Sequence, residues 1–415
     1  MCRVTHRMVI LFFLLLFSMG LNAQEHCATD ELRAYYKLHI PGYSVRIRKV
    51  DSFLAETNRE PALERRTTIY LPIVVHVVYN EASENISDDQ IISQIEALNQ
   101  DFAAQRVDPS IPLEFKDRVG ESHIRFCLAT LDPEGKATSG ITRTYTNISD
   151  IGLRKDNSGR KLVHYTRLGG EDAWDTGKYI NIWVCKMISV LGYASRPGEA
   201  PNPAEDGIVV DSRHFGTQGT VVQPNTDGRT AVHEMGHYLG LYHIWGTDSQ
   251  GCGDDQIEDT PPQQGPHYGC PQYPVFSCDN NNMTMNFMDY TDDRCMYMFT
   301  KGQVDYMFNA LKNMRLSLLE NAGSYCGDAF KEPLSKRMTV FPTITRNHIW
   351  ISQKEPGNGL IKARVFNIAN RIVGEYSLIS DEVMELPLGK NIPPGIYFLQ
   401  LKTSSDQVTF RFIIQ

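Results

Sequence analysis

The stretch from Thr230 to Gly246, TAVHEMGHYLGLYHIWG, places three histidines where one helix and the turn after it can bring them together. His233 and His237 are four residues apart, so on a helix both side chains lie on the same face. Gly240 can end the helix and turn the chain, because glycine adopts positive φ at little cost. The turn would then bring His243 toward the other two rings. The sequence therefore predicts a helix whose end is shaped around one metal ion.

Three neutral imidazoles leave one position open on a tetrahedral Zn²⁺ ion, which is what a catalytic zinc site requires. Water in that position becomes acidic enough to lose a proton near neutral pH. Glu234 follows the first histidine and points away from the ligand face. We therefore expect Glu234 to be the general base that accepts this proton and passes it to the leaving amine. Ordinary surface histidines are the alternative, but the spacing H-E-x-x-H-x-x-G-x-x-H would arise by chance in roughly one such chain in ten thousand.

The composition limits the kinds of protein that this chain can be. A length of 415 residues is enough for two or three domains, and the 41% hydrophobic and 22% charged content is that of a globular protein. The formal net charge of -8 is spread along the chain without a basic block, which argues against nucleic-acid binding.

The N-terminus has the three parts of a secretory signal peptide. Arg3 and Arg7 precede an apolar run from residue 8 to 19, and small residues then lead to a cleavage site after Ala23. A run of about 12 apolar residues is too short to span a membrane. Residues 1–23 are therefore expected to be a signal peptide, and the protein to be secreted or held at the cell surface.

The rest of the chain divides into three predicted parts. Residues 24–66 are polar and mixed, residues 67–326 carry the chemistry, and residues 327–415 begin with a charged connector and continue as short strands. The central part predicts an α/β or α+β domain, with strands within 67–79, 123–131, 179–187 and 206–217 and a helix within 87–104 that begins with Ser87 and Gln90 as a capping box. The seven or so strand-like runs after residue 338 predict a β-sandwich.

Export changes how the cysteines are interpreted, because paired cysteines in an oxidising compartment are more often disulfides than metal ligands. Four of them lie in a Gly-, Pro-, Asp- and Asn-rich stretch after the histidines, and two bridges would hold this long loop: Cys252, Cys270, Cys278 and Cys295. Cys127 and Cys185 lie in predicted strands, where buried thiols and a bridge are both alternatives.

One cysteine, Cys27, lies just after the predicted signal peptide. Its thiolate is a suitable fourth ligand for zinc and would displace the water, which would keep an enzyme inactive. A leader cysteine without a role is the alternative, but an odd cysteine in a secreted protein calls for a reason. Residues 24–66 are therefore expected to be a propeptide with a cysteine switch, released by cleavage near Arg59 or Arg65–Arg66.

The stretch HEMGHYLGLYH resembles the extended zinc signature of the metzincin metalloproteases. The stretch MNFMDYTDDRCMYMFTKGQ resembles the methionine turn that lies below the metal in that clan, with Met288 as the turn methionine. By the same resemblance, Tyr290 approaches the zinc and stabilises the developing oxyanion. The resemblance implies an α+β catalytic domain with a mixed twisted sheet, an active-site helix and an irregular C-terminal subdomain, followed by a small all-β sandwich.

Among the metzincins, residues 70 to 310 are similar to the pappalysin family through FCLA, DPEGKATSGITR, INIWVC, GIVVDSRHFGT, EDTP and NFMDY. The family pattern implies the bridges Cys252–Cys278 and Cys270–Cys295. It also implies structural calcium in the loop after the zinc motif, where oxygen ligands are available from Asp254, Asp255, Asp259 and Thr260. A solvated acidic loop is the alternative.

One position departs from the family pattern. Bacterial members that cleave before arginine carry an aspartate just ahead of the last cysteine of the second loop, where this chain has Arg294. An arginine there would repel a basic side chain and favour an acidic or polar one. Asp292 and Asp293 are the alternatives that would compensate for it.

The tail resembles the C-terminal sorting domain of the type IX secretion system, through its opening VFP, the run PPGIYFLQL and the final FRFIIQ. This resemblance implies that the secretion machinery recognises the C-terminal domain and that the protein is exported across an outer membrane. A generic carbohydrate- or partner-binding sandwich is the alternative.

Together these features predict a secreted zinc-dependent endopeptidase that acts on proteins or peptides and is made as a latent proenzyme. An extended substrate is expected to pair with residues 207–211 or with residues 191–194. Two other functions remain as alternatives: a surface adhesin with a structural zinc, and a zinc amidase that acts on a non-protein substrate.

Overall fold

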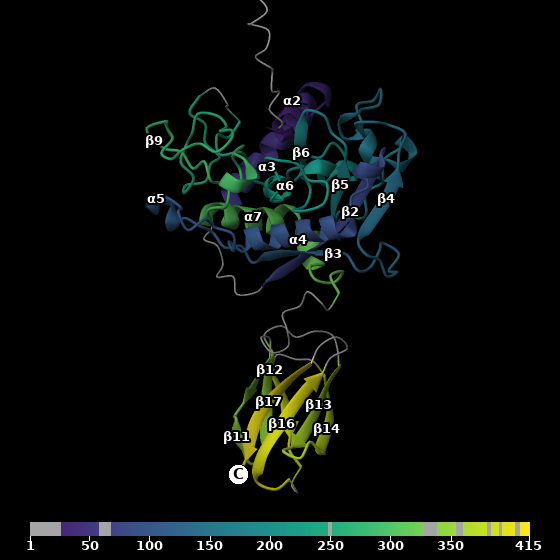
Figure 1. Cartoon of the computed structure of the whole chain (residues 1–415), viewed down its shortest axis with the longest axis vertical. Coiled ribbons are helices and arrows are strands. Elements are labelled where there is room, and N and C mark those ends of the chain that lie inside the picture. The colour runs from purple at the N-terminus through teal and green to yellow at the C-terminus, as the bar shows by residue number, and fades with distance from the viewer. Residues whose placement is uncertain are drawn as a thin grey trace, which may run out of the picture. The chain divides into compact units, whose positions relative to one another are not determined.

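In a computed structural model, the chain divides into two compact units at the boundary between Tyr325 and Cys326 (Figure 1). The structure describes residues 26–57, 68–247, 251–327, 338–353, 360–379, 383–389, 392–402 and 407–415. The predicted signal peptide and the expected cleavage positions Arg59, Arg65 and Arg66 lie outside the described residues. Within the described part, no helix combines the length and the apolar character needed to cross a membrane.

The first unit contains a seven-stranded mixed sheet in the order β1-β6-β7-β5-β2-β3, with β4 also paired to β2. Neighbouring strands are parallel, except that β6 is antiparallel to β7. The strands are β1 (His26–Cys27), β2 (Ile69–Tyr79), β3 (Ile124–Leu128), β4 (Ile141–Tyr145), β5 (Ile180–Cys185), β6 (Val190–Ala194) and β7 (Ile208–Asp211). The four strands predicted from apolar runs are confirmed as β2, β3, β5 and β7. Strands β5 and β7 are fully buried, which explains why their sequences are apolar on both faces.

Helix α4 (Asp88–Phe102) begins where the capping pattern predicts. The Ser87 hydroxyl accepts a hydrogen bond of 3.2 Å from the backbone N–H of Gln90. The reciprocal half of the predicted capping box is replaced by a tertiary contact, because the Gln90 side-chain amide donates to the backbone carbonyls of Ser212 and Phe215. Gln90 therefore ties α4 to the segment that follows β7.

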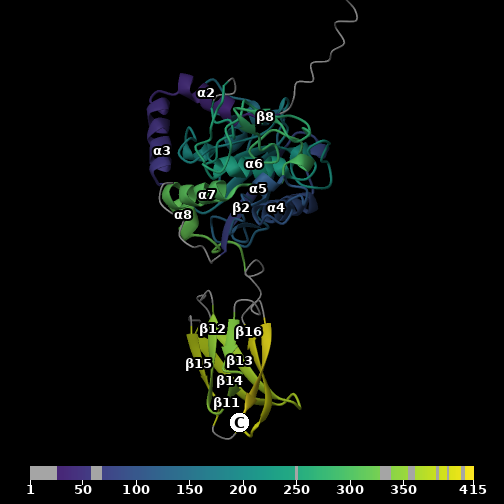
Figure 2. The same cartoon turned by 90° about the vertical axis from the view of Figure 1, so that its left-hand side faces the viewer.

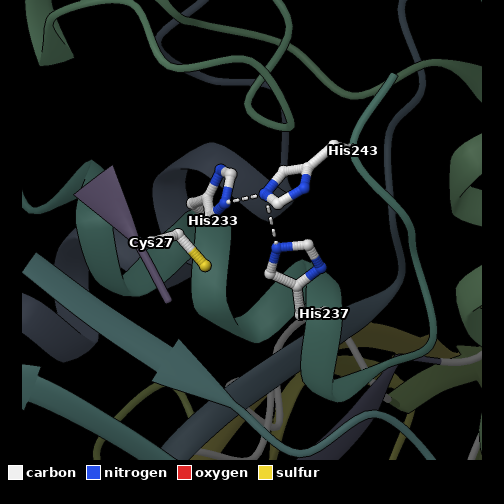
Figure 3. Close-up of side chains that lie close together, drawn as sticks. All are labelled: Cys27, His233, His237 and His243. Carbon is white, nitrogen blue, oxygen red and sulfur yellow. Dashed lines mark hydrogen bonds between the residues drawn. The ribbon is translucent and has the colours of Figure 1, made fainter. Parts of the chain in front are cut away.

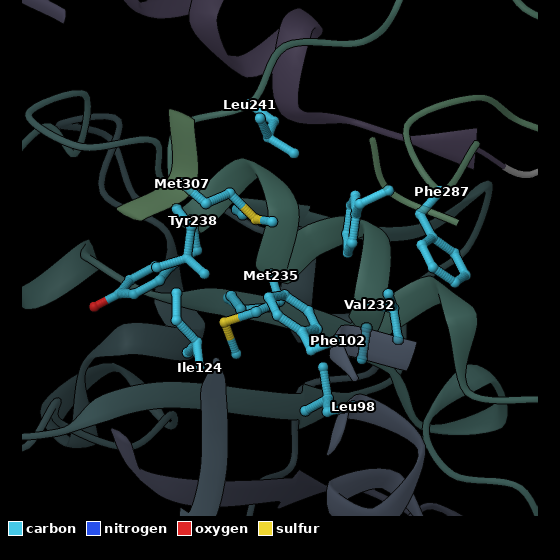
Figure 4. Close-up of a cluster of buried hydrophobic side chains, with 14 of the residues drawn as sticks. Leu98, Phe102, Ile124, Val232, Met235, Tyr238, Leu241, Phe287 and Met307 are labelled. Atoms are coloured by element: carbon cyan, nitrogen blue, oxygen red, sulfur yellow. The ribbon is translucent and has the colours of Figure 1, made fainter. Parts of the chain in front are cut away.

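Helix α6 (Arg229–Tyr238) lies inside the first unit and is buried along its whole length (Figures 1 and 2). It contacts α4 on one side and strands β6 and β7 on the other. Its apolar side chains belong to one continuous core with those of α4 and of the segments that follow α6 (Figure 4): Leu98, Phe102, Val232, Met235, Tyr238, Leu241, Phe287 and Met307. Since full burial of such a side chain contributes about 1.5–3 kcal/mol, this packing holds α6 firmly in place.

The region between α6 and α7 (Lys301–Met314) is irregular: its described residues include the short strands β8 (Phe276–Ser277) and β9 (Asn280–Asn281) and a 3-10 turn, Asp293–Cys295. Disulfides join Cys252 to Cys278 and Cys270 to Cys295, which are the pairs that the family resemblance implies. Cys127 is disulfide-bonded whereas Cys185 is a buried thiol outside any disulfide, so these two do not bridge each other. Two short helices, α5 (Leu113–Lys116) and α8 (Leu316–Glu320), complete the unit.

Residues 26–57, called the N-terminal segment below, fold onto the first unit as β1 and two helices, α2 (Thr29–His39) and α3 (Tyr43–Thr57) (Figure 2). Helix α2 contacts β6, and α3 contacts α7. Their inward faces are buried through Arg33, Tyr36, Tyr43, Ile47 and Leu54. The sequence analysis predicted no helix in this region.

The second unit is a β-sandwich, as predicted. One sheet has the order β10-β12-β15 and the other β11-β17-β16-β13-β14. Alternate residues of β12 and β16 are buried, and they contribute to one apolar core shared by both sheets. The strands are β10 (Met338–Phe341), β11 (Ile344–Thr345), β12 (His348–Gln353), β13 (Leu360–Asn367), β14 (Ile372–Ile379), β15 (Val383–Pro387), β16 (Gly395–Lys402) and β17 (Gln407–Ile414).

A buried histidine in the sheet gives a prediction for the pH dependence of stability. On β2, the ring nitrogens of His76 lie 2.8 Å from the Thr142 hydroxyl and 3.0 Å from Asn181 Oδ1. Burial lowers the pKa of His76 to about 4 from an ordinary 6.5. Below pH 6.5 the unfolded chain binds a proton at His76 that the folded chain excludes. The stability that neutral His76 gives the folded chain is therefore fully present above pH 6.5 and is lost as the pH falls toward 4.

When the pH falls from about 7 to about 5, we expect the free energy of unfolding to decrease by about 2 kcal/mol because of His76. The measurement is urea unfolding of the wild type and of His76→Gln at both pH values. The variant should be less stable at neutral pH but should lose less on acidification. The same substitution at the partly exposed His123 is the control. Identical pH slopes for the wild type and His76→Gln would contradict the prediction.

Candidate metal centre and active site

The three predicted ligand histidines come together because of the turn after α6. His233 and His237 lie on α6, which ends at Tyr238. Gly240 follows with a φ of 108°, so the chain reverses at the predicted glycine. A Cβ at this position would also lie 3.0 Å from the Ala310 side chain. The reversal brings His243 against the two helical histidines.

The hydrogen bonds of the rings define what these histidines can hold. The Nδ1 atoms of His233 and His237 lie 2.7 and 2.8 Å from the carbonyl oxygens of Phe287 and Leu241. Nδ1 of His243 lies 2.7 Å from a carboxylate oxygen of Asp30. Since each Nδ1 faces an acceptor, it carries the proton, and each Nε2 is left with a lone pair.

These Nε2 atoms converge on one point. Nε2 of His243 lies 3.2 Å from that of His233 and 3.0 Å from that of His237 (Figure 3, dashed lines). Burial lowers the pKa of His233 to about 3 and lowers the pKa of His237 well below its ordinary value, so both rings are neutral. Lone pairs of neutral rings repel one another at this distance, and a cation bound between them removes the repulsion. The residues present therefore fit Zn²⁺, which prefers neutral imidazole nitrogens.

Cys27 is placed where it could supply the fourth donor. Its sulfur and the three ring nitrogens all lie within 4.8 Å of one another, and all four residues are buried. Figure 3 shows the thiol pointing from β1 toward the imidazoles. The N-terminal segment reaches this position because β1 adds to β6 as a parallel strand, and because the N–H of Ala28 donates to the Gly192 carbonyl at 2.9 Å.

Glu234 is buried beside the metal centre. Its carboxylate accepts hydrogen bonds of 3.4 Å from the Cys27 thiol and from the Thr29 hydroxyl. Burial raises the pKa of Glu234 to about 8. The side chain passes close under β6, where a Cβ on Gly192 would stand 2.9 Å from Cγ and 3.0 Å from Oε1 of Glu234. The sequence analysis did not identify Gly192, because the need for glycine there arises only from the packing of the strand on the helix.

Met288 packs against helix α6, and Tyr290 lies beside the histidine cluster. Met288 is fully buried, and a Cβ on Gly236 of α6 would stand 2.5 Å from its sulfur. Its loop also supplies the Phe287 carbonyl that orients His233. The Tyr290 ring lies 4.8 Å from that of His243, and its hydroxyl donates to the backbone carbonyl of Cys27 at 3.1 Å.

The start of α6 is capped by a residue from the loop that the Cys270–Cys295 disulfide closes. Gly228 at the N-cap position has no side chain to accept from the first turn. The carboxylate of Asp293 accepts instead, from the N–H groups of Asp227 at 2.8 Å and Arg229 at 3.2 Å. Such a cap stabilises a helix by about 1 kcal/mol and favours a negative charge at this end. No local sequence pattern links these positions, so only the structure identifies the cap.

A cluster of buried charges fastens the N-terminal segment near the metal centre. The Arg33 guanidinium lies 3.1 Å from the Glu199 carboxylate and donates to the Tyr242 hydroxyl at 2.8 Å. Arg196, from the segment after β6, also binds Glu199 at 2.8 Å and stacks 3.3 Å from the Tyr242 ring centre. Asp51, from the N-terminal segment itself, also pairs with Arg33 at 2.8 Å. The segment is thus held by ion pairs as well as by β1.

A cavity of about 410 Å³ opens beside Glu234 and His233. Its wall includes both aspartates that the sequence analysis offered as alternatives, Asp292 and Asp293. Arg294 does not belong to it: its side chain is 73% exposed, and it lines a separate hollow. Arg294 therefore lies outside the wall of this cavity, because the short 3-10 turn Asp293–Cys295 points successive side chains in different directions, and its effect on specificity stays a prediction.

The acidic residues after the zinc motif have different surroundings. Oδ1 of Asp255 accepts from the Thr260 hydroxyl at 2.5 Å, whereas its Oδ2 is buried without a hydrogen-bond partner among the described residues. Asp254 accepts from the N–H of Gln256. The Asp259 carboxylate instead binds the start of α7, at 2.6 Å from the Thr300 hydroxyl and 2.8 Å from the N–H of Gly302. The expected calcium ligand Asp259 is thus occupied as a helix cap.

Comparisons with known proteins agree with this geometry. The sequence pattern described as pregnancy-associated plasma protein-A, peptidase M43, matches residues 168–312. A mutant of Tannerella forsythia promirolysin superimposes with a TM-score of 0.66 at 39% identity, over 73% of this chain and 100% of that chain. Mature mirolysin from the same organism, in complex with a cleaved peptide, matches with a TM-score of 0.60 at 44% identity, over 63% of this chain and 100% of that chain. An extracellular metalloprotease of Arthroderma otae is 29% identical over 257 residues, 60% of this chain and 79% of its own length.

The fold and the histidine centre define a metzincin-type zinc metalloendopeptidase. Within that class, the chain belongs to the pappalysin family, peptidase M43. It is made as a latent proenzyme, and its relatives are extracellular proteases. Membership of this family favours the peptidase over both alternatives from the sequence, the adhesin and the amidase.

The close approach of Gly192 to Glu234 gives a test of the packing at the active site. In Gly192→Ala, the added methyl group should push the Glu234 carboxylate aside and lower kcat/KM roughly 10- to 100-fold. Zinc content, measured by atomic absorption, should stay at one ion per chain. Gly177→Ala is the matched control, because its Cβ would meet only side chains at 3.3 Å or more. Unchanged kcat/KM in Gly192→Ala would contradict this account of Glu234.

Proposed function

We propose that the enzyme hydrolyses peptide bonds with His233, His237 and His243 as zinc ligands and Glu234 as the general base. The observation that carries this proposal is the convergence of three histidine Nε2 atoms with one buried carboxylate beside them. A purely structural zinc site does not need a buried carboxylic acid beside its ligands. Glu234 is the only acidic residue of α6, so the role falls on it.

Zinc, when bound, supplies a Lewis acid that polarises the scissile carbonyl and acidifies the attacking water. Glu234 takes the proton of that water and delivers it to the leaving nitrogen. Tyr290 donates a hydrogen bond to the oxygen that becomes negatively charged on the substrate carbon. Its present bond to the Cys27 carbonyl supports this role, since a peptide carbonyl is already its acceptor. Met288 supports the floor by packing under Gly236.

The substrate is proposed to bind in extended form along β6. Of the two runs named from the sequence, residues 207–211 contain β7, which already pairs with β5 and β6 on its two edges. Residues 191–194 belong to β6, whose outer edge carries only β1 of the N-terminal segment. Removal of β1 exposes backbone groups that a peptide can pair with, and main-chain pairing of this kind binds many sequences.

The pocket beside the metal centre is proposed to accept a basic or polar side chain. Asp293 is engaged at the start of α6, so Asp292 is the carboxylate whose charge faces an incoming side chain. The two arginines in the wall are already paired: Arg213 with Asp211, and Arg229 with the Asp293 carbonyl. A cleavage profile from a peptide library reads this preference directly.

Latency and export complete the proposal. We propose that residues 1–23 are a signal peptide, 24–66 a propeptide in which Cys27 occupies the fourth zinc position, 67–326 the catalytic domain, and 327–415 a sorting domain for type IX secretion. The promirolysin match covers a larger share of this chain than the mature mirolysin match, 73% against 63%, which supports a propeptide of this size. The extracellular relatives support export.

Calcium is proposed to bind in the loop after the zinc motif. The supporting observation is the buried Oδ2 of Asp255, which lacks a partner within the described residues. Burial raises the pKa of Asp255 well above its ordinary value, so a cation bound beside this carboxylate would be needed to keep it ionised. Asp255, Thr260 and Asp254 are the proposed ligands, and Ca²⁺ accepts such carboxylate and hydroxyl oxygens.

The proposed general base is tested by substitution in the mature form, prepared by limited cleavage with a serine protease that is then inhibited. Glu234→Ala and Glu234→Gln should lower kcat on casein by about 10²- to 10⁴-fold, with zinc retained, because only proton transfer is removed. A chelator should abolish wild-type activity, and added zinc should restore it. Glu96→Ala, at an exposed position of α4, is the control. Activity that survives loss of Glu234 or of zinc would rule out the proposal.

The calcium site is tested by thermal unfolding with and without calcium at constant zinc. Millimolar calcium should raise Tm of the wild type by roughly 5–10 °C, because an ion that binds only the folded state stabilises it by mass action. Asp255→Asn should lose most of this shift. Asp108→Asn, at an exposed turn outside the loop, should keep it. An equal calcium shift in wild type and Asp255→Asn would exclude Asp255 as a ligand.

A further inference from the structure

The three zinc histidines differ in where their outer hydrogen bonds come from. For His233 and His237 the acceptor is a backbone carbonyl of the catalytic unit, from Phe287 and Leu241. For His243 the acceptor is the side chain of Asp30, at 2.7 Å from Nδ1. Asp30 is the second residue of α2, within the N-terminal segment that maturation is proposed to remove. One metal ligand is therefore oriented by a group that the mature enzyme does not keep.

His243 is the ligand that most needs such a partner. His233 and His237 are fixed by α6, whereas His243 follows the turn at Gly240 and lies outside the helix. Its ring stacks on Trp245, at 4.5 Å between centres and 7° between planes, which fixes the plane but not the proton. A carboxylate acceptor holds the proton on Nδ1, keeps Nε2 directed at the metal and makes it a stronger donor.

The position of Asp30 is set by the segment and not by the histidine. On one side, β1 pairs with β6, and the Thr29 hydroxyl accepts from the N–H of Ala194 at 3.0 Å. On the other side, one turn further along α2, Arg33 lies in the charge cluster at Glu199. Asp30 lies between these two attachments, so its position beside His243 is fixed by the contacts of the segment. Losing the segment removes the carboxylate together with the Cys27 sulfur.

We propose that Asp30 is a positioning residue for the zinc ligand His243, so that the N-terminal segment strengthens zinc binding through His243 as well as through Cys27. Zinc and the segment then stabilise each other, because the coupling between two bound groups is reciprocal. Maturation lowers zinc affinity by two separate losses, a sulfur ligand and an outer-sphere carboxylate. The inference rests on the proposed function for the zinc ligands and for the removal of the segment.

The test is the rate of zinc release from the full-length precursor to a chromogenic chelator, with chain length checked by mass spectrometry before and after. Asp30→Ala should release zinc about 10- to 100-fold faster than wild type, the usual effect of removing an outer-sphere partner. Asp30→Asn keeps an acceptor oxygen without the charge and should fall between the two. Glu31→Ala removes a neighbouring charge from the same helical turn and should release zinc at the wild-type rate.

Two further measurements separate this role from a general effect on the segment. In a Cys27→Ser background, Asp30→Ala should still accelerate release; an effect that disappears there would mean that Asp30 only places the thiol, and would overturn the proposal. In zinc-free protein, Asp30→Ala should unfold at the wild-type Tm, with only the zinc-dependent increase reduced. Equal release from Asp30→Ala and wild type, or equal acceleration by Glu31→Ala, would also overturn it. Failure of the proposed function would look different: a Glu234→Ala enzyme that still cleaves casein.

Discussion

Three imidazole nitrogens without protons, two of them at 3.0 and 3.2 Å from the third, are the constraint on which the rest of this structure depends. Such an arrangement is stable only around a cation, and only if every outer nitrogen keeps its proton. The chain meets the second condition with acceptors from three separate places: the turn after α6, the loop that carries Met288, and the N-terminal segment. Many distant contacts therefore serve to present these acceptors at fixed positions.

The same arrangement explains how the N-terminal segment blocks the site. The outer edge of β6 offers unpaired backbone groups, and a short parallel strand fills it while directing Cys27 at the histidines. The segment occupies the β6 edge, the Tyr290 hydroxyl and the space at Glu234, which are the groups that the proposed substrate binding would use. Its hold also includes the buried charges around Glu199, where Arg33 and Asp51 enter as a neutral pair. With the proposed maturation the two would leave together, and the mature enzyme would keep the balanced pair of Arg196 and Glu199.

The sequence predicted the parts of the site that depend on local spacing. The helical pair His233 and His237, the turn at Gly240 and the buried strand β2 each follow from a period or a residue type that a short window contains. The parts that depend on long-range contacts were missed: Asp30 beside His243, Gly192 over Glu234, and Asp293 at the start of α6. The position of Arg294 outside this cavity was not predicted for a related reason, since sequence adjacency does not say which way each side chain of a tight turn points. Helices α2 and α3 were not predicted because their buried faces mix charged and aromatic residues with few aliphatic ones.

The irregular region between α6 and α7 brings the remaining requirements together. It supplies the floor methionine, the acceptor for His233, the tyrosine beside the metal and the carboxylate that caps α6. Two disulfides and the Asp259 bonds to α7 fix it from both sides, which compensates for its lack of regular strands. The wall of the pocket and the residues below the metal centre thus belong to the same cross-linked region. Most substitutions in the pocket wall are therefore expected to disturb the proposed zinc ligands as well. Asp292 is the exception, since its charge faces the pocket and its nearest basic partner is 4.0 Å away. Specificity can therefore change at this position while the geometry that holds the metal stays intact.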